Sequence, residues 1–241
     1  LREMATTYGR SAGGYLWAIL DPVLGVALLS ILFSFALRQP PIGENFALFY
    51  ASGYLPFSMF NSLSQKISRS VQFSRPFMSY PCVTFMDTLV ARLVLNGLTD
   101  VVVMAIIVLG IIFIYDLPFG IDVGTLSLTL SLIILLSAGI GTLNCFIMTS
   151  FPIYERVWSI ITRPLFLISG IFFTYDAMPP LARDVLWYNP IVHVVAMTRQ
   201  GVYLTYDATF ASPLFVTSLS LVMLVTGLFL LLRHYRDLME R

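Results

Sequence analysis

The stretch TLVARLVLNGLTDVVVMAIIVLGIIFIY, residues 88–115, decides the fold class of this chain. It is longer than the run of about 20 mainly apolar residues that a helix needs to cross a bilayer. Arg92, Asn96 and Asp100 recur every four residues within it and therefore share one stripe of a helix. Because a charge facing lipid costs about 2.5–3.5 kcal/mol, we expect this stripe to face the bundle interior or water.

The composition extends this conclusion to the whole chain. Of its 241 residues, 58% are hydrophobic and 11% are charged, whereas a soluble domain carries about 25% charged residues. The chain is therefore expected to fold in a lipid bilayer rather than in water. A net charge of +1 without a basic patch argues against a nucleic-acid partner. Cys82, Cys145, His193 and His234 lie far apart, so no metal site is expected.

Six apolar segments are long enough to cross a membrane, and they predict a single permease domain over residues 1–241. We expect the spans at about 15–37, 46–65, 88–115, 124–151, 157–175 and 213–232. Residues 190–203 are too few and too mixed to cross, and indicate a re-entrant or interfacial helix. The predicted fold class is all-α, a polytopic membrane bundle of six transmembrane helices.

The basic residues predict the orientation, because Lys and Arg accumulate on the cytoplasmic side. With the N-terminus and the C-terminus in the cytoplasm, eleven of the 14 basic residues lie inside or at the inner boundary. They are Arg2, Arg10, Lys66, Arg69, Arg75, Arg92, Arg156, Arg163, Arg233, Arg236 and Arg241. Arg38, Arg183 and Arg199 lie outside.

Several enzyme motifs are absent. Lys66, followed by Ile67, is the one lysine of the chain, so a Walker A loop is missing and any ATP and Mg must bind to a partner. The segment GRSAG (Gly9–Gly13) matches a nucleophile elbow by letters but has no sheet around it, and its glycines fit helix packing better. An intramembrane lipid-modifying enzyme would need His, Asp or Ser clustered at one depth, and we predict no catalytic residue.

Polar groups inside the predicted spans have a simple interpretation as contacts that lock helices together. Asp21, Asn96, Asp100 and Asn144 form this set. Asp21 and Arg92 both lie near the inner boundary, which predicts that they are close to each other. Ser137, Gly139 and Gly141 predict close approach of the fourth span to a neighbouring helix.

Several stretches together resemble a known family. They are YGRSAGGYLWAILDPVLGVALLSILFS (8–34), FALFYASGYLPFSMF (46–60), RPFMSYPCVTFMDTLVARL (75–93), RPLFLISGIFFTYDAMPP (163–180) and WYNPIVHVVAMTRQGVY (187–203). The chain is similar to the membrane subunits of type-two ABC exporters, and specifically to capsule-polysaccharide export permeases. O-antigen and teichoic-acid exporters share much of this pattern, and a small-molecule or lipid exporter is a further alternative.

The resemblance implies partners and moving parts. It implies a second copy of the chain, two ATP-binding subunits, a bacterial inner membrane and periplasmic accessory proteins. Residues 68–85 would be the cytoplasmic coupling helix that docks on the ATPase, although a short basic helix also suits anionic lipid. Its docking residues would be Arg69, Phe73, Arg75, Phe77, Met78 and Tyr80. Tyr8 and Arg10 would belong to an N-terminal interfacial gate helix, and residues 176–212 would form periplasmic re-entrant helices.

The same resemblance implies a lipid-linked acidic polysaccharide as substrate. Aromatic rings stack on sugars and arginines attract anions, although aromatic residues also favour membrane interfaces in general. The candidate pathway residues are Arg38, Phe46, Phe49, Tyr50, Tyr54, Arg92, Arg163, Phe166, Phe172, Phe173, Tyr175 and Arg199.

Overall fold

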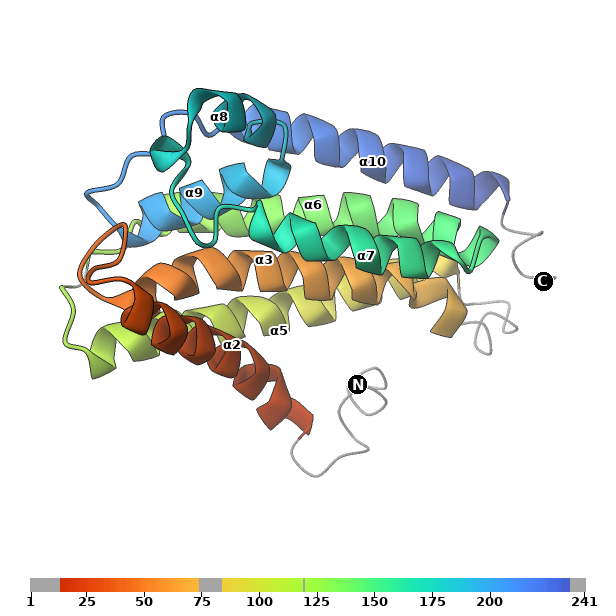
Figure 1. Ribbon diagram of the computed structural model, residues 1–241. Helices are drawn as coiled ribbons and strands as arrows, with labels where there is room; N and C mark the ends of the chain where they lie inside the picture. Colours follow the sequence, from red (N-terminus) through yellow and green to blue (C-terminus); the bar gives the residue numbers. More distant parts are fainter. Residues whose placement is uncertain (1–13, 74–83, 119, 235–241) are drawn as a thin grey trace.

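The computed structural model describes residues 14–73, 84–118 and 120–234 (Figure 1). Its helices are α2 (Gly14–Ala36), α3 (Phe46–Ser68), α5 (Phe85–Ile114), α6 (Val123–Ser150), α7 (Tyr154–Leu167), η1 (Tyr175–Ala177), α8 (Pro180–Leu186), α9 (Pro190–Val202) and α10 (Pro213–Arg233). No strand occurs among the described residues, which agrees with the predicted all-α class.

The long helices form a bundle. α6 packs against α10 on one side and against α3 on the other, and α3 also packs against α5. In Figure 1 these four helices run side by side, α7 lies alongside them, and α2 crosses at a slant. The short helices α8 and α9 gather at one end of the bundle.

Among the described residues, four helices are long and apolar enough to cross a membrane: Leu16–Ala36, Phe85–Ile114, Val123–Ser150 and Pro213–Arg233. α3 has 23 residues, which corresponds to about 34 Å, but polar residues in its second half lower its hydropathy. α7 has only 14 residues, fewer than a straight crossing needs. The predicted number of six spans therefore stays a prediction, with α3 and α7 as the two helices in question.

Local chemistry explains where two helices differ from the prediction. α5 begins at Phe85 rather than near residue 88, because Thr84 and Asp87 form a reciprocal capping box. α7 ends at Leu167, whereas a span was expected over 157–175. The chain leaves the helix there and turns at Gly170, whose φ of 76° suits glycine.

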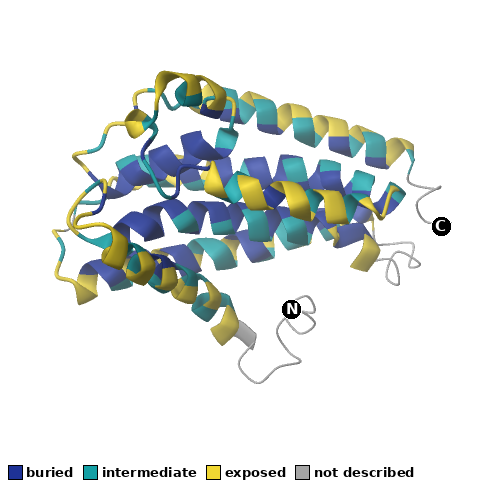
Figure 2. Ribbon diagram, in the orientation of Figure 1, coloured by how far each residue is buried: buried dark blue, intermediate teal, exposed yellow. Residues whose placement is uncertain are grey.

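Glycines set the distances between α6 and its neighbours. A Cβ at Gly227 of α10 would lie 2.6 Å from the backbone nitrogen of Leu143, and a Cβ at Gly139 would collide with the carbonyl oxygen of Ser220. A Cβ at Gly141 would lie 2.8 Å from the Cβ of Ile67 in α3. The close approach predicted for this part of α6 is confirmed, and the buried residues concentrate along α3, α6 and α9 (Figure 2).

The two ends of the bundle differ in charge. At one end α3 and α10 finish and α5 and α7 start. Its basic residues are Lys66, Arg69, Arg92, Arg156 and Arg233, and we name it the basic end. The opposite end holds α8, α9 and the loop residues 37–45, 115–118 and 120–122, and we name it the α9 end.

Candidate functional site

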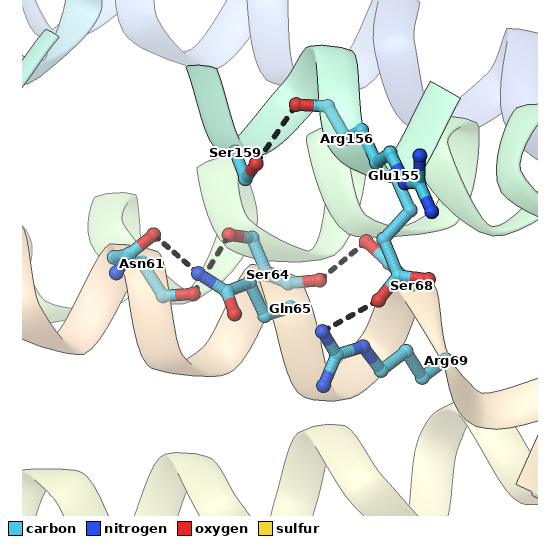
Figure 3. A network of polar contacts seen from close by, with 8 residues as sticks. All are labelled: Asn61, Ser64, Gln65, Ser68, Arg69, Glu155, Arg156 and Ser159. Atoms are coloured by element: carbon cyan, nitrogen blue, oxygen red, sulfur yellow. Dashed lines mark hydrogen bonds and ion pairs between the residues drawn. The ribbon is translucent and has the colours of Figure 1, made fainter. Parts of the chain in front are cut away.

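An ion pair connects two helices at the basic end. Nη2 of Arg69, the residue that caps α3, lies 2.6 Å from Oε1 of Glu155 in the first turn of α7 (Figure 3). Both side chains are about half exposed, so solvent screening limits the contribution of the pair to stability to no more than about 1 kcal/mol. Its importance is geometric, because it fixes the start of the predicted coupling segment against α7.

A polar ladder on α3 leads up to this ion pair. Nε2 of Gln65 donates to Oδ1 of Asn61 at 2.8 Å, and Oγ of Ser68 donates to the Ser64 carbonyl at 2.6 Å (Figure 3). The ladder borders a cavity of about 530 Å³ between α3 and α7. The cavity is lined by Gln65, Ser68, Arg69, Glu155, Arg156 and Trp158, among others.

The polar stripe of α5, expected to face the bundle interior or water, faces α3. Asn96 is buried, and Nζ of Lys66 in α3 lies 3.9 Å from Oδ1 of Asp100. Nη1 of Arg92 donates to the Lys66 carbonyl at 3.1 Å, and its guanidinium lies over the Phe73 ring. The stripe therefore meets the last turn of α3, just before the predicted coupling segment.

The described contacts of Asp21 and of Arg92, the partner expected for it, are with different groups. Asp21 lines a cavity together with Lys66 and Asp100, whereas the hydrogen bond and ring contact described for Arg92 are with Lys66 and Phe73. Neither ion pair of the described residues joins Asp21 to Arg92, and their proximity stays a prediction. Asp21 borders the same cavity as Asp100, which lies about two turns beyond Arg92 on α5.

A buried arginine organises the α9 end. Arg199 of α9 donates from its two terminal nitrogens to the carbonyls of Phe173 and Ile171, each at 2.9 Å. Its guanidinium carbon lies 4.3 Å from the centre of the Phe49 ring. Only 2% of Arg199 is exposed, so this cation holds the non-helical segment after α7 against α3 and α9.

His193 connects α9 to both neighbouring segments. The backbone N–H of Ser212 donates to Nδ1 of His193, so Nε2 carries the proton and donates to the Trp187 carbonyl at 2.7 Å. Burial lowers the pKa of this imidazole below its ordinary value. His193 is therefore a neutral structural crosslink rather than a metal ligand.

Aromatic side chains form a continuous cluster between α2, α3 and the segment around α7. The Phe166 ring lies 5.2 Å from Phe57 and 5.3 Å from Phe172, and Phe172 lies 5.5 Å from Phe33. Tyr54 also contacts Phe166. Phe57 is buried, whereas Phe33, Tyr54, Phe166 and Phe172 are partly buried beneath α2 and α7.

Comparison with known proteins identifies the family of this chain. A family model described as ABC-2 type transporter matches residues 1–203. The chain belongs to this family. Among its relatives, the polysialic acid transport protein KpsM of Escherichia coli is 33% identical over 229 residues, which cover 95% of this chain and 88% of KpsM.

Two further relatives of this ABC-2 type chain come from other bacteria. The capsule polysaccharide export inner-membrane protein CtrC of Neisseria meningitidis serogroup B is 25% identical over 228 residues, covering 95% of this chain and 86% of CtrC. The capsule polysaccharide export inner-membrane protein BexB of Haemophilus influenzae is 25% identical over 232 residues, with the same two coverages. These similarities extend over nearly the whole chain.

The residues predicted to couple to an ATPase are placed only in part. Arg69 contacts Glu155, and Phe73 is exposed beneath the Arg92 guanidinium. Arg75, Phe77, Met78 and Tyr80 lie outside the described residues, as do Tyr8 and Arg10 of the predicted gate helix. For these six residues the sequence prediction stands by itself.

The predicted pathway residues fall into two groups. Phe49, Tyr50 and Arg199 are buried, and within this chain they act as packing residues because no surface is left on them for a substrate. Arg38 and Arg163 are exposed, and Phe46, Tyr54, Arg92, Phe166, Phe172, Phe173 and Tyr175 are partly buried. Tyr175 stacks on Phe210, with 3.8 Å between the ring centres.

Three contacts between helices could not be predicted from the sequence. Lys66 as the partner of Asp100 depends on the register of α3 against α5, and Glu155 as the partner of Arg69 depends on how α7 returns to α3. The orientation of His193 depends on the loop that precedes α10. The only sequence signal was an intramembrane acid that required a cation.

Proposed function

We propose that this ABC-2 type chain is the membrane subunit of an exporter that moves a lipid-linked, acidic capsular polysaccharide across the bacterial inner membrane. The observation that carries the proposal is similarity over 95% of the chain to relatives named for polysialic acid transport and capsule polysaccharide export. Four helices suited to membrane crossing support it. The chain itself is not an enzyme in this proposal, and the export is driven by a separate subunit.

The energy comes from two ATP-binding partner subunits, which bind ATP and Mg. The chain has no Walker A loop of its own, because its one lysine is followed by isoleucine. The basic end is the surface that these partners contact, through the segment that begins at Arg69. A movement imposed on this segment reaches α7 through the ion pair between Arg69 and Glu155, and reaches α5 through Arg92 and Lys66.

The path for the polymer lies between two copies of the chain. The exposed apolar side chains of α2 support this arrangement, because only 11% of its membrane-crossing window is buried within one chain. The aromatic cluster lies beneath α2 and α7, where partly buried rings such as Tyr54 and Phe166 can meet sugar faces when these helices part. Arg38 and Arg163 supply positive charge for an acidic polymer.

The membrane arrangement follows from the charge of the two ends. We place the basic end and both chain termini in the cytoplasm, with six crossings formed by α2, α3, α5, α6, α7 and α10. α8 and α9 lie on the periplasmic side as short helices that dip toward the membrane without crossing. Periplasmic accessory proteins would meet the α9 end.

Complementation tests the proposal. A strain that lacks its own capsule permease is supplied with this chain and the P-loop ATPase encoded beside it. We expect capsule at the cell surface and co-purification of the ATPase with the chain. A chain that is stably inserted but neither restores capsule nor retains the ATPase would contradict the proposal. Restoration of O-antigen or teichoic acid instead would assign the alternative substrate.

A further inference from the structure

Two cavities follow one another along the same two helices, α2 and α5. The first, the polar cavity, has a volume of about 290 Å³ and is lined by Asp21, Ser58, Ser62, Lys66, Asp100 and Trp17, among others. The second, the apolar cavity, has a volume of about 350 Å³ and is lined by Val26, Ile31, Ile106, Gly110, Ile111 and Ile114, among others. Pro22 borders the first and Val23 the second, so the cavities adjoin on α2.

The charges of the polar cavity are not balanced. Lys66 carries one positive charge, whereas Asp21 and Asp100 carry two negative charges. The Lys66–Asp100 pair is loose, at 3.9 Å, and Oδ2 of Asp100 is buried without a hydrogen-bond partner among the described residues. Asp21 forms no ion pair with another described residue. In a membrane-embedded cavity this arrangement favours a group that brings positive charge and donates hydrogen bonds.

The apolar cavity has the opposite chemistry. Its lining is almost entirely aliphatic, with Ser30 and Tyr115 as its polar members. A Cβ at Gly110 would meet nothing within 4 Å, which marks open space on α5. Such a cavity between membrane helices suits a hydrocarbon chain, and its place next to a charged cavity suits a molecule that has both a charged head and an apolar tail.

We propose that the polar and apolar cavities together bind one aminophospholipid. The ammonium group of the lipid lies between the carboxylates of Asp21 and Asp100, and its phosphate accepts hydrogen bonds from Lys66. One acyl chain follows α2 and α5 into the apolar cavity. A free inorganic cation would balance the carboxylates but would leave the adjoining apolar cavity without an occupant, so the pair of cavities favours the lipid.

Lipid retention tests this proposal directly. The full chain is reconstituted in nanodiscs of equimolar phosphatidylethanolamine and phosphatidylglycerol, released into mild detergent, and examined by native mass spectrometry. We expect one retained lipid per chain, with phosphatidylethanolamine favoured by about tenfold, the ratio that one charge-assisted hydrogen bond provides. Equal retention of the two lipids, or no retained lipid, would overturn the proposal.

Two variants separate the head from the tail. Asp21→Asn keeps the size of the side chain and should abolish the preference for phosphatidylethanolamine. Gly110→Leu places a larger side chain in the apolar cavity, at a position where an added Cβ meets nothing within 4 Å, and should reduce retention of both lipids. An unchanged lipid preference in Asp21→Asn, or unchanged lipid retention in Gly110→Leu, would overturn the proposal.

Matched controls exclude general effects on the fold. Asp184→Asn changes an exposed acid of α8 that borders neither cavity, and should leave the lipid preference unchanged. Gly110→Ala adds only a Cβ in open space and should retain lipid normally. Equal effects of Asp21→Asn and Asp184→Asn would count against the polar cavity as the headgroup site. Capsule complementation is measured separately, so failure of the lipid proposal leaves the export proposal intact.

Discussion

The α6–α10 seam and the α2–α5 crevice are built from equally apolar helices but pack in opposite ways. In the seam, glycines at 139 and 227 let backbones touch, and 39% of the membrane-crossing window of α6 is buried. In the crevice two cavities remain, and only 11% of the corresponding window of α2 is buried. The seam is therefore completed within one chain, whereas the surface of α2 requires lipid or a second copy.

This difference indicates which part is a scaffold and which part moves. Backbones that touch at a glycine fix the position of one helix against the other, because a side chain at that position would collide with the neighbouring backbone. The crevice and the aromatic cluster beneath α2 and α7 have no such constraint. In an exporter that opens and closes, we expect α6, α10 and α3 to stay together while α2 and α7 change position.

Gly227→Leu should have the largest effect, because it breaks the seam. The new side chain would meet backbone atoms of Leu143 and Thr142 within 3 Å, and we expect a loss of about 3 kcal/mol or more. The measurement is the thermal unfolding midpoint of the purified chain. Gly110→Leu in the crevice should shift the midpoint little, and equal losses in the two variants would remove the distinction between seam and crevice.

Arg199→Met should have the next largest effect. The change leaves the carbonyls of Ile171 and Phe173 without their donors in a buried site, with a cost of about 2–3 kcal/mol. Unfolding measured beside Arg38→Met, an exposed arginine at the same end, checks this expectation. If the two variants lose equally little stability, Arg199 would be available to a substrate rather than engaged in packing.

His193 predicts a smaller, pH-dependent effect at the α9 end. Its pKa is lowered in the folded chain, so the unfolded chain binds more protons below pH about 6.5. Stability should therefore be complete above this pH and decline as the pH falls toward 5. The measurement is the melting curve of the unmodified chain and of His193→Gln, each recorded between pH 7 and pH 5. A pH dependence that is the same in both would assign it to other groups.

Exchanging the charges of Arg69 and Glu155 should have the smallest effect on stability, below about 1 kcal/mol, because both side chains are half exposed. Its effect on function should be larger, since the pair connects α3 to α7. Arg69→Glu should reduce capsule export without lowering the amount of inserted chain, and addition of Glu155→Arg should restore export in part. Arg233→Ala, at the same end, is the control. If adding Glu155→Arg to Arg69→Glu restores no export, the contact between these two residues is incidental to function.

Most of the fold follows from residue patterns, but the partners across helices do not. The membrane class, the stripe of Arg92, Asn96 and Asp100, and the close packing at Gly139 are all set by spacing along one helix. The pairing of Lys66 with Asp100 depends on how two helices slide against each other, which one sequence does not encode locally. The early end of α7 escaped prediction because the apolar residues continue past Leu167 while the backbone turns at Gly170.

The candidate site was predictable in type rather than in detail. A basic segment between α3 and α5 indicated a docking surface, but the contact with Glu155 requires the return of α7. Arg199 was expected to face the substrate path because its positive charge would attract an anionic polymer. Two backbone carbonyls instead accept hydrogen bonds from its terminal nitrogens, and these carbonyls are available because the chain after α7 is not helical.

Photo-crosslinking from the two ends of the bundle tests the central claim most directly. A crosslinking residue is placed at Phe77, in the predicted coupling segment, and another at Leu181, exposed on α8 at the α9 end. We predict that Phe77 captures the ATPase subunit, with a yield that changes when ATP is bound, and that Leu181 does not. Capture of the ATPase from Leu181, or of phospholipid alone from Phe77, would contradict the account.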